Sequence, residues 1–189
     1  PNQFNLLTIA NDVYRTSGNR EKALEYAELL IIHHPSKWKG FGRLAQDLVE
    51  LKRLEEAQRK ISEGLKKFPN QFNLLTIAND VYRTSGDREK ALKYAELLIT
   101  HHPDKWAGYA RSAQDLNILD RFTKIRAQRK IEEGLKRFPN HPGILKVANS
   151  VYRRDREKSL RFAELLILHH PYNWIGYNLA TQDLCALKR

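Results

Sequence analysis

Apolar side chains recur along this chain with the spacing of helices. Near the start, Leu7, Ala10, Asn11 and Tyr14 follow the i, i+3, i+4, i+7 pattern of a single helical face. A Ser-Gly-Asn break follows, and a second amphipathic run comes after it. The next stretch of chain repeats this arrangement of two runs separated by a break. The pattern predicts an all-α fold made of amphipathic helices that pair as hairpins.

Prolines close these hairpins at nearly regular intervals of 34, 34, 34, 36 and 32 residues. The prolines of this series are Pro1, Pro35, Pro69, Pro103, Pro139 and Pro171. Proline cannot continue a helix and biases the preceding residue out of the helical region, so each one ends a motif. A fixed period in this range is typical of repeat proteins. We predict a single solenoid over residues 1–189 with five hairpins and one terminal helix, at about 2–35, 36–69, 70–103, 104–139, 140–171 and 172–189.

The repeat is in fact double, with a period of two hairpins. Residues 1–35 and 69–103 differ at only three of their 35 positions. Tryptophans recur every 68 residues, at Trp38, Trp106 and Trp174. The middle copy gains two residues around 120–125, and the third loses two where Thr84-Ser85-Gly86 becomes Arg154. Such close identity indicates recent duplication or deliberate design, so a designed array without a natural ligand is one alternative.

These motifs resemble the tetratricopeptide repeat (TPR), whose pattern of apolar, small and aromatic positions ends in proline. In the first motif the pattern is held by Leu7, Ala10, Asn11, Tyr14, Gly18, Ala23, Ala27, Leu30 and Pro35. In the second it is held by Phe41, Leu44, Ala45, Leu48, Ala57, Ile61, Gly64 and Pro69. The chain departs from the family at Asn11, where a small residue is usual, and at Gly64 and Gly134, where alanine is usual. The resemblance implies an α-solenoid with a right-handed superhelix that serves as a protein–protein interaction scaffold and not as an enzyme.

Composition adds little that is specific. The 189 residues are 41% hydrophobic and 29% charged, with a net charge of +11, one cysteine and no methionine. No stretch approaches the roughly 20 apolar residues of a membrane span, so we expect no membrane partner. Because the chain begins and ends within the repeat pattern, we interpret it as a fragment that lacks its N-terminus, and we favour the cytoplasm as its location.

A polar stripe runs beside the packing face of each motif's first helix. In the TPR family the first helices line the concave surface, so the resemblance places this stripe in a groove for an extended or helical peptide. The predicted groove residues are Asp12, Arg15, Lys39, Arg43, Gln46, Asp80, Arg83, Arg111, Gln114, Lys146 and Arg153. The alternative is that the stripe is only a solvated helix face.

The family's best-known ligand mode, a clamp for a C-terminal carboxylate, is incomplete in this chain. Lys39 and Arg43 stand where the third motif of such a clamp places its lysine and arginine. The asparagine of the clamp's middle motif, however, falls at Ile9. A carboxylate-bearing peptide could still pair with Arg43 and Arg111, which align on successive double repeats.

Metal, cofactor and catalytic sites are not predicted. Adjacent residues on a helix point about 100° apart, so the His-His pairs before three of the prolines do not form a two-ligand face. A histidine at a helix C-terminus is instead favoured by the helix dipole. No nucleophile–base pair or Gly-rich phosphate loop is present in the sequence. The recurring Gln-Asp-Leu runs favour hydrogen bonding between helices over chemistry.

Three further interpretations stay open. The net positive charge suggests nucleic-acid binding as an alternative function. Against it, the cations alternate with glutamates on the second helices, as on a solvated face, and the tryptophans are expected to pack between hairpins. The array is alternatively an accessory or regulatory region of a larger protein, such as a bacterial transferase. The last helix retains Trp174, Tyr177 and Leu184 without a following helix, which predicts end-to-end self-association or a swapped dimer with Cys185 near the junction.

Overall fold

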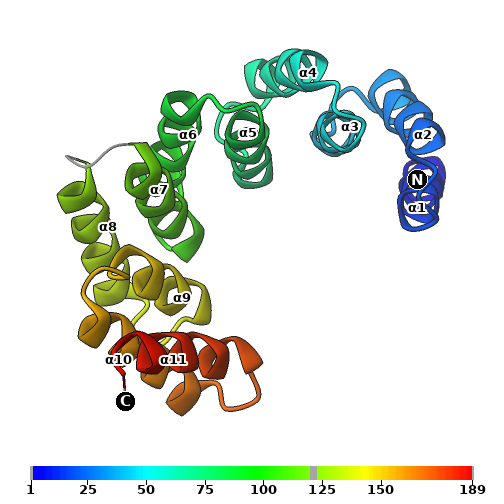
Figure 1. The fold of residues 1–189 in the computed structure, drawn as a ribbon. Helices are drawn as coiled ribbons and strands as arrows, with labels where there is room; N and C mark the ends of the chain where they lie inside the picture. Colours follow the sequence, from blue (N-terminus) through cyan, green and yellow to red (C-terminus); the bar gives the residue numbers. More distant parts are fainter. Residues whose placement is uncertain (1, 120–122, 189) are drawn as a thin grey trace. The chain divides into compact units, whose positions relative to one another are not determined.

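The computed structural model describes residues 2–119 and 123–188 of the chain, and these residues form helices and turns without a strand. Part of the predicted insertion, residues 120–122, lies outside the described residues, as does Pro1. The helices of the described ranges are shown in Figure 1. They are α1 (Asn2–Thr16), α2 (Arg20–His33), α3 (Lys39–Glu50), α4 (Leu54–Lys67), α5 (Phe72–Thr84), α6 (Arg88–His101), α7 (Trp106–Leu119), α8 (Lys124–Arg137), α9 (Pro142–Val151), α10 (Arg156–His169) and α11 (Trp174–Ala186).

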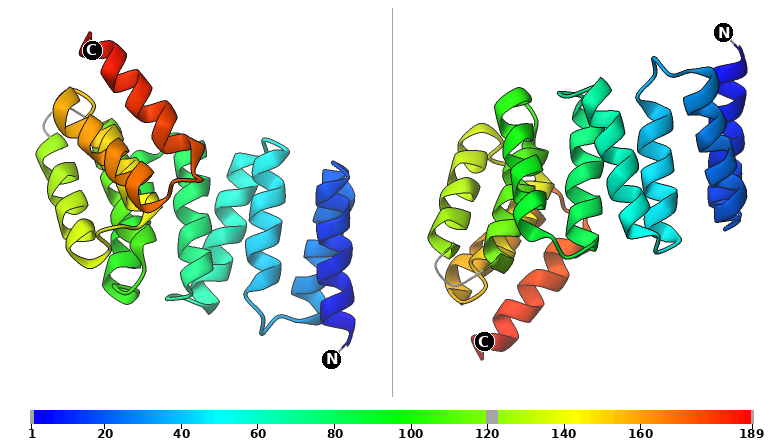
Figure 2. Two further views of the ribbon diagram at one scale, coloured as in Figure 1. Left: turned by 90° about the horizontal axis from the view of Figure 1, so that it is seen from below. Right: turned by 90° about the horizontal axis from the view of Figure 1, so that it is seen from above.

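The described helices follow one another in tandem and pack on their neighbours, so the predicted all-α repeat fold is confirmed. The chain divides into two compact units, Pro1–Tyr94 and Ala95–Arg189, and the division falls inside α6. Within unit 1, α1 packs on α2, α3 packs on α4, and α5 contacts both α3 and α4 (Figure 2). Within unit 2, α9 contacts α7 and α8 in the same way, and α10 packs between α9 and α11.

The helix boundaries have local causes. Asn19 and Asp155 cap α2 and α10, because their side chains accept hydrogen bonds from the backbone N–H groups of Lys22 and Lys158. At the other end of α2, His34 precedes a proline and has left the helical region, with φ −134° and ψ 56°. Its N–H still donates to the carbonyl of Leu30, which closes the last turn. The sequence signals for starts and stops therefore act as expected.

The core of unit 1 lies between the hairpins and explains one departure from the family pattern. Phe41, Leu44, Ile61 and Leu74 are almost completely buried there. A Cβ at Gly64 would lie only 2.8 Å from the Cβ of Phe41, so α3 and α4 approach too closely for the usual alanine. In unit 2 the matching Gly134 lies against Tyr109 in the same way.

Candidate functional site

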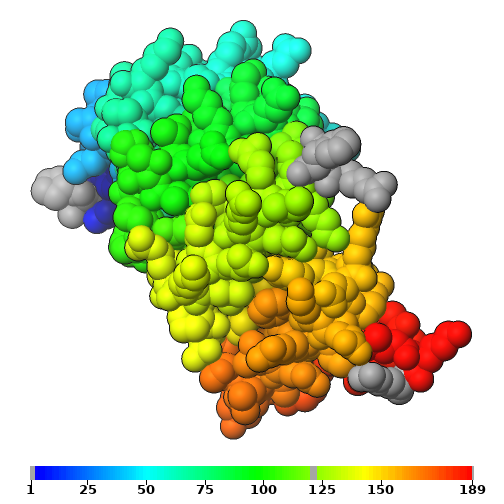
Figure 3. Space-filling view, turned by 90° about the vertical axis from the view of Figure 1, so that its left-hand side faces the viewer, coloured from blue at the N-terminus to red at the C-terminus, as the bar shows by residue number. Residues whose placement is uncertain are grey.

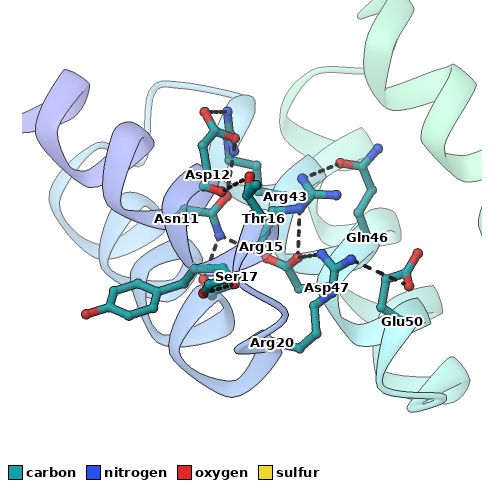
Figure 4. A network of polar contacts seen from close by, with 12 residues as sticks. Asn11, Asp12, Arg15, Thr16, Ser17, Arg20, Arg43, Gln46, Asp47 and Glu50 are labelled. Carbon is teal, nitrogen blue, oxygen red and sulfur yellow. Dashed lines mark hydrogen bonds and ion pairs between the residues drawn. The ribbon is translucent and has the colours of Figure 1, made fainter.

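A buried hydrogen-bond network joins the first helices of two successive motifs in unit 1 (Figure 4). Asn11 on α1 and Asp47 on α3 are both fully buried. The Asn11 Nδ2 donates to the carbonyl of Ala23 at 2.6 Å and to Asp47 Oδ2 at 2.9 Å. Arg15 Nε lies 3.1 Å from Asp47 Oδ1, and Arg20 Nη1 lies 3.8 Å from the same oxygen. Through these contacts a single asparagine ties together α1, α2 and α3.

Burial sets the titration of the central carboxyl. The pKa of Asp47 is raised above its ordinary value, chiefly because burial disfavours the charged form. The hydrogen bond from Asn11 and the charges of Arg15 and Arg20 act in the opposite direction. The network therefore has a structural role, and the free-energy cost of burying the Asp47 carboxylate is only partly offset by its hydrogen-bond and charge partners.

Unit 2 contains the same device. Asn149 Nδ2 donates to the carbonyl of Ser159 at 2.9 Å and to Asp183 Oδ2 at 2.8 Å. The Ser159 hydroxyl also donates to Asp183 Oδ2 at 2.7 Å, and Arg156 Nη1 lies 2.8 Å from Asp183 Oδ1. Asp47 and Asp183 belong to the Gln-Asp-Leu runs, so the predicted hydrogen bonding between helices is confirmed for these two runs. This buried network explains why Asn11 occupies a position where the family usually has a small residue.

In unit 1 the polar stripe converges on one cleft of about 310 Å³ between α1, α3 and α5. We call it the unit 1 cleft. It is lined by Arg15, Trp38, Lys39, Arg43, Gln46, Asn73, Thr76, Ile77 and Asp80. Five of the predicted groove residues are therefore brought together: Arg15, Lys39, Arg43, Gln46 and Asp80.

The cations of the unit 1 cleft differ in how strongly the protein already holds them. Arg43 pairs with both carboxylate oxygens of the exposed Asp12, with 2.9 Å between Nη2 and Oδ2, and this hydrogen bonding is the main cause that lowers the pKa of Asp12. Arg15 is held by Asp47 and also donates to Gln46 Oε1 at 3.2 Å. The ammonium of Lys39 lies 5.7 Å from the Phe4 ring, and no carboxylate among the described residues forms an ion pair with it. Lys39 is thus the cleft cation most available to a ligand.

A second cleft, of about 750 Å³, lies in unit 2 between the ends of α7 and α9 and the starts of α8 and α10. We call it the unit 2 cleft. It is lined by Asn117, Ile118, Lys124, Ser150, Val151, Arg153, Arg154 and Arg156. Arg153 was a predicted groove residue, whereas Lys124, Arg154 and Arg156 were not. The signal that was missed is a difference in charge between the two copies of the double repeat.

The remaining predicted groove residues line neither cleft. Arg83 on α5 is half-buried, as are Arg111 and Gln114 on α7, and Lys146 on α9 is exposed. Asp12 stands beside the unit 1 cleft through its contacts with Arg43. Whether these residues contact a ligand stays a prediction.

The tryptophans do not share one environment. Trp38 is half-buried against the unit 1 core, and Trp106 is half-buried with its ring stacked on His141 at 4.4 Å. Trp174, by contrast, is 70% exposed. The expectation that it packs between hairpins is wrong, because in the described chain no helix follows α11 to cover it.

The histidines act locally where the structure shows them. His34 and His170 are C-cap residues of α2 and α10, and the Phe4 ring meets His34 edge-on at 5.2 Å. Over the described ranges, no three His, Cys, Asp or Glu side chains gather as metal ligands would. In the same ranges no helix combines the length and apolarity needed to cross a membrane.

Comparison with known proteins places this fold. No family model matches the sequence. A TPR protein from Parabacteroides merdae superposes with a TM-score of 0.75 at 16% sequence identity, over 100% of this chain and 75% of that one. A thermophilic TPR protein from Thermus thermophilus gives 0.73 at 15%, over 97% and 99% of the two chains. YrrB, a TPR protein with an unusual peptide-binding site, gives 0.62 at 15%, over 89% and 87%.

These likenesses show that the chain has the tetratricopeptide-repeat fold, as the motif pattern predicted. The identities are too low to transfer a ligand, so the function rests on the clefts of this chain.

Proposed function

We propose that this chain is a protein-interaction scaffold whose unit 1 cleft binds an extended segment of a partner protein. The observation that carries the proposal is the convergence of side chains from α1, α3 and α5 on one open cleft. Helical repeat proteins commonly bind partners along such first-helix surfaces, and one protein of similar fold is described as having a peptide-binding site. In this proposal the chain binds and does not catalyse.

The chemistry of the cleft suits a peptide with a carboxylate. Asn73 offers an amide group for pairing with an extended backbone, and Thr76, whose hydroxyl donates to the Phe72 carbonyl at 2.9 Å, offers its oxygen as an acceptor. Trp38 and Ile77 supply apolar surface beside them, and Lys39 supplies a charge that a Glu, an Asp or a C-terminus would neutralise. A volume of about 310 Å³ is enough for one or two ligand side chains.

A peptide display library panned against the purified chain tests the proposal. We expect selected peptides to be enriched in acidic residues, and Lys39→Glu to weaken their binding about tenfold or more, since it replaces a charge-assisted contact by a repulsive one. Lys136→Glu is the matched control, because Lys136 is an exposed residue of α8 that lines neither cleft and is not a predicted groove residue. Equal loss in both variants, or no loss in Lys39→Glu, would remove the unit 1 cleft from the proposal.

We also propose that copies of the chain associate end to end through α1 and α11. Leu6, Ile9 and Val13 of α1 are 64%, 57% and 57% exposed. The residues at the matching positions of α5, within an identical stretch of sequence, are buried against α3 and α4: Leu74, Ile77 and Val81. The face that α1 leaves open is therefore one that packs on a TPR hairpin elsewhere in the same unit.

The α11 helix offers the complementary face. Tyr177 is 49% exposed, whereas Tyr109 at the matching position of α7 is 3% exposed, because the α7–α8 hairpin covers it. Packing α1 of one copy on α11 of another is a head-to-tail contact, which builds chains of copies. Sedimentation at increasing protein concentration tests this: the mass should rise for the wild type and stay monomeric for Val13→Glu, with Ile32→Glu as the exposed control on α2. A wild type that is monomeric throughout refutes the contact.

A further inference from the structure

We propose that the unit 2 cleft binds a phosphate group carried on a segment of a partner protein. The inference shares with the proposed function only the statement that the partner is a protein. It concerns a different cleft, in a different unit, with a different ligand chemistry.

The lining of the unit 2 cleft is cationic. Lys124 is the first residue of α8, Arg156 is the first residue of α10, and Arg153 and Arg154 lie between α9 and α10 (the α8–α10 surface is seen in Figure 3). Among the described residues, no carboxylate lines this cleft. Four positive side chains around one concave surface form a field that attracts a multiply charged anion.

Two of these four cations are only partly engaged by the protein and two are not engaged by any described group. Arg156 pairs with the buried Asp183 at 2.8 Å, and Arg153 makes a long contact of 3.4 Å with Gln182 Oε1. Arg154 is exposed and Lys124 is half-buried, and neither forms an ion pair with a described residue. Asp155, which lies between Arg154 and Arg156 in the sequence, accepts a hydrogen bond from the backbone N–H of Lys158 at 3.2 Å and pairs with the Lys158 ammonium at 3.4 Å.

Matching positions in residues 49–88 of unit 1 give an internal comparison, because they precede the unit 2 cleft by one period of the double repeat. Two cleft arginines are retained, since Arg153 matches Arg83 and Arg156 matches Arg88. Of the other lining positions, Val151 matches Val81, Asn117 replaces Val49 without a change of charge, and four differences each raise the charge of the unit 2 cleft by one. They are Ile118 for Glu50, Lys124 for Leu54, Ser150 for Asp80, and Arg154 for Thr84-Ser85-Gly86.

The gain of positive charge continues into the start of α8. The first turn of α4 contains Glu55 and Glu56, whereas the first turn of α8 has no acidic residue and contains Ile125 and Arg126 at the matching places. Cations at a helix N-terminus oppose the helix dipole, so this exchange costs stability in the free protein. A bound anion reverses that cost, because it is attracted both by the side chains and by the helix end. Differences that destabilise the free state and gather on one cleft are typical of a ligand site.

The cleft favours a phosphorylated side chain over a nucleic acid. Arginine pairs with phosphate oxygens bidentately, and Arg154 and Arg153 stand beside each other for this role. A volume of about 750 Å³ accommodates a phosphorylated residue with its neighbours. A nucleic-acid groove generally adds aromatic rings for stacking, and the described lining of this cleft contains none.

A capped pentapeptide of alanines with a central phosphoserine is the probe, with the unphosphorylated peptide and a ten-residue oligothymidine as comparisons. Binding is measured by calorimetry and by the Nε–Hε NMR signals of the arginines. We expect the phosphopeptide to bind and shift the signals of Arg153 and Arg154, the unphosphorylated peptide to leave them unmoved, and Arg154→Ala to weaken binding at least fivefold. Arg129→Ala, an exposed α8 residue outside the cleft, should bind as the wild type does.

Three outcomes would overturn the inference: equal binding of the two peptides, equal affinity of Arg154→Ala and the wild type, or tighter binding of oligothymidine that Arg154→Ala abolishes. The last result would assign the cleft to nucleic acid. Lys39→Glu keeps phosphopeptide binding if the inference is correct, so a failure of the unit 1 proposal is recognised separately.

Discussion

Replacing Asn11 by alanine tests the physical reasoning about the buried network most directly. Alanine is the residue found at the equivalent places of the second and fourth motifs, Ala45 and Ala113, so pattern alone predicts a harmless change. The structure predicts the opposite. The variant loses the bonds that Asn11 donates to the Ala23 carbonyl and to the buried Asp47 carboxylate, and the bond that Asn11 Oδ1 accepts from Arg43. It thereby leaves two buried acceptors with fewer partners.

The size of the effect is set by the two bonds to buried acceptors, because Arg43 keeps its pairing with Asp12 when the third bond is lost. A bond to a neutral carbonyl contributes about 0.5–1.5 kcal/mol, and a bond to a charged group contributes about 1.5–3 kcal/mol. The sum, about 2–4.5 kcal/mol, is a large share of the ~5–15 kcal/mol that stabilises a typical domain. Arg15 and Arg20 stay close to Asp47 and keep the loss near the lower end of this range.

Urea unfolding measures the loss, and hydrogen exchange of the α1–α3 amides shows where it acts, since repeat proteins open locally. Asn73→Ala is the control, because Asn73 is exposed and its loss should cost no more than about 0.5 kcal/mol. In the double variant with Asp47→Ala the two losses should not add, because the residues share one bond. An Asn11→Ala protein as stable as the wild type, or strictly additive losses, would refute the account of the network.

Two further predictions concern unit 1. In a carboxyl NMR titration, Asp47 should titrate above the ordinary value of 3.8 and Asp12 below it. Consequently the stability that Asp12 contributes is present above that value and is lost as the pH falls through its lowered pKa, whereas the contribution of Asp47 declines as the pH rises through its raised pKa. The reverse order of the two midpoints would contradict the assigned burial and pairing. Separately, Gly64→Ala should destabilise by about 1–3 kcal/mol in urea unfolding, although alanine is the better helix former, because its Cβ would meet Phe41 at 2.8 Å. A more stable Gly64→Ala protein would show that α3 and α4 separate easily.

Much of the candidate site could be predicted from the sequence, but the division of its residues into those available to a ligand and those held by the protein could not. The stripe of first-helix polar residues could be read from periodicity, and Lys39, Gln46 and Asp80 do meet at one cleft. Periodicity does not say which cations are already engaged, because Arg15 and Arg43 are held by carboxylates of neighbouring helices. For that reason a stripe of apparently similar residues contains ligand candidates beside structural ones.

The sequence by itself determined the hairpins, since proline, capping residues and helical periodicity act within a few residues of each other. Asp155 and Gly18 place turns, and Pro35 ends a helix, whatever the rest of the chain does. The tertiary structure alone decided that Asn11 bonds to Asp47, 36 residues away, and that Lys124 joins Arg154 and Arg156 around one cleft. Burial and convergence depend on how helices pack side by side, and that packing brings together residues whose separation along the chain carries no local signal.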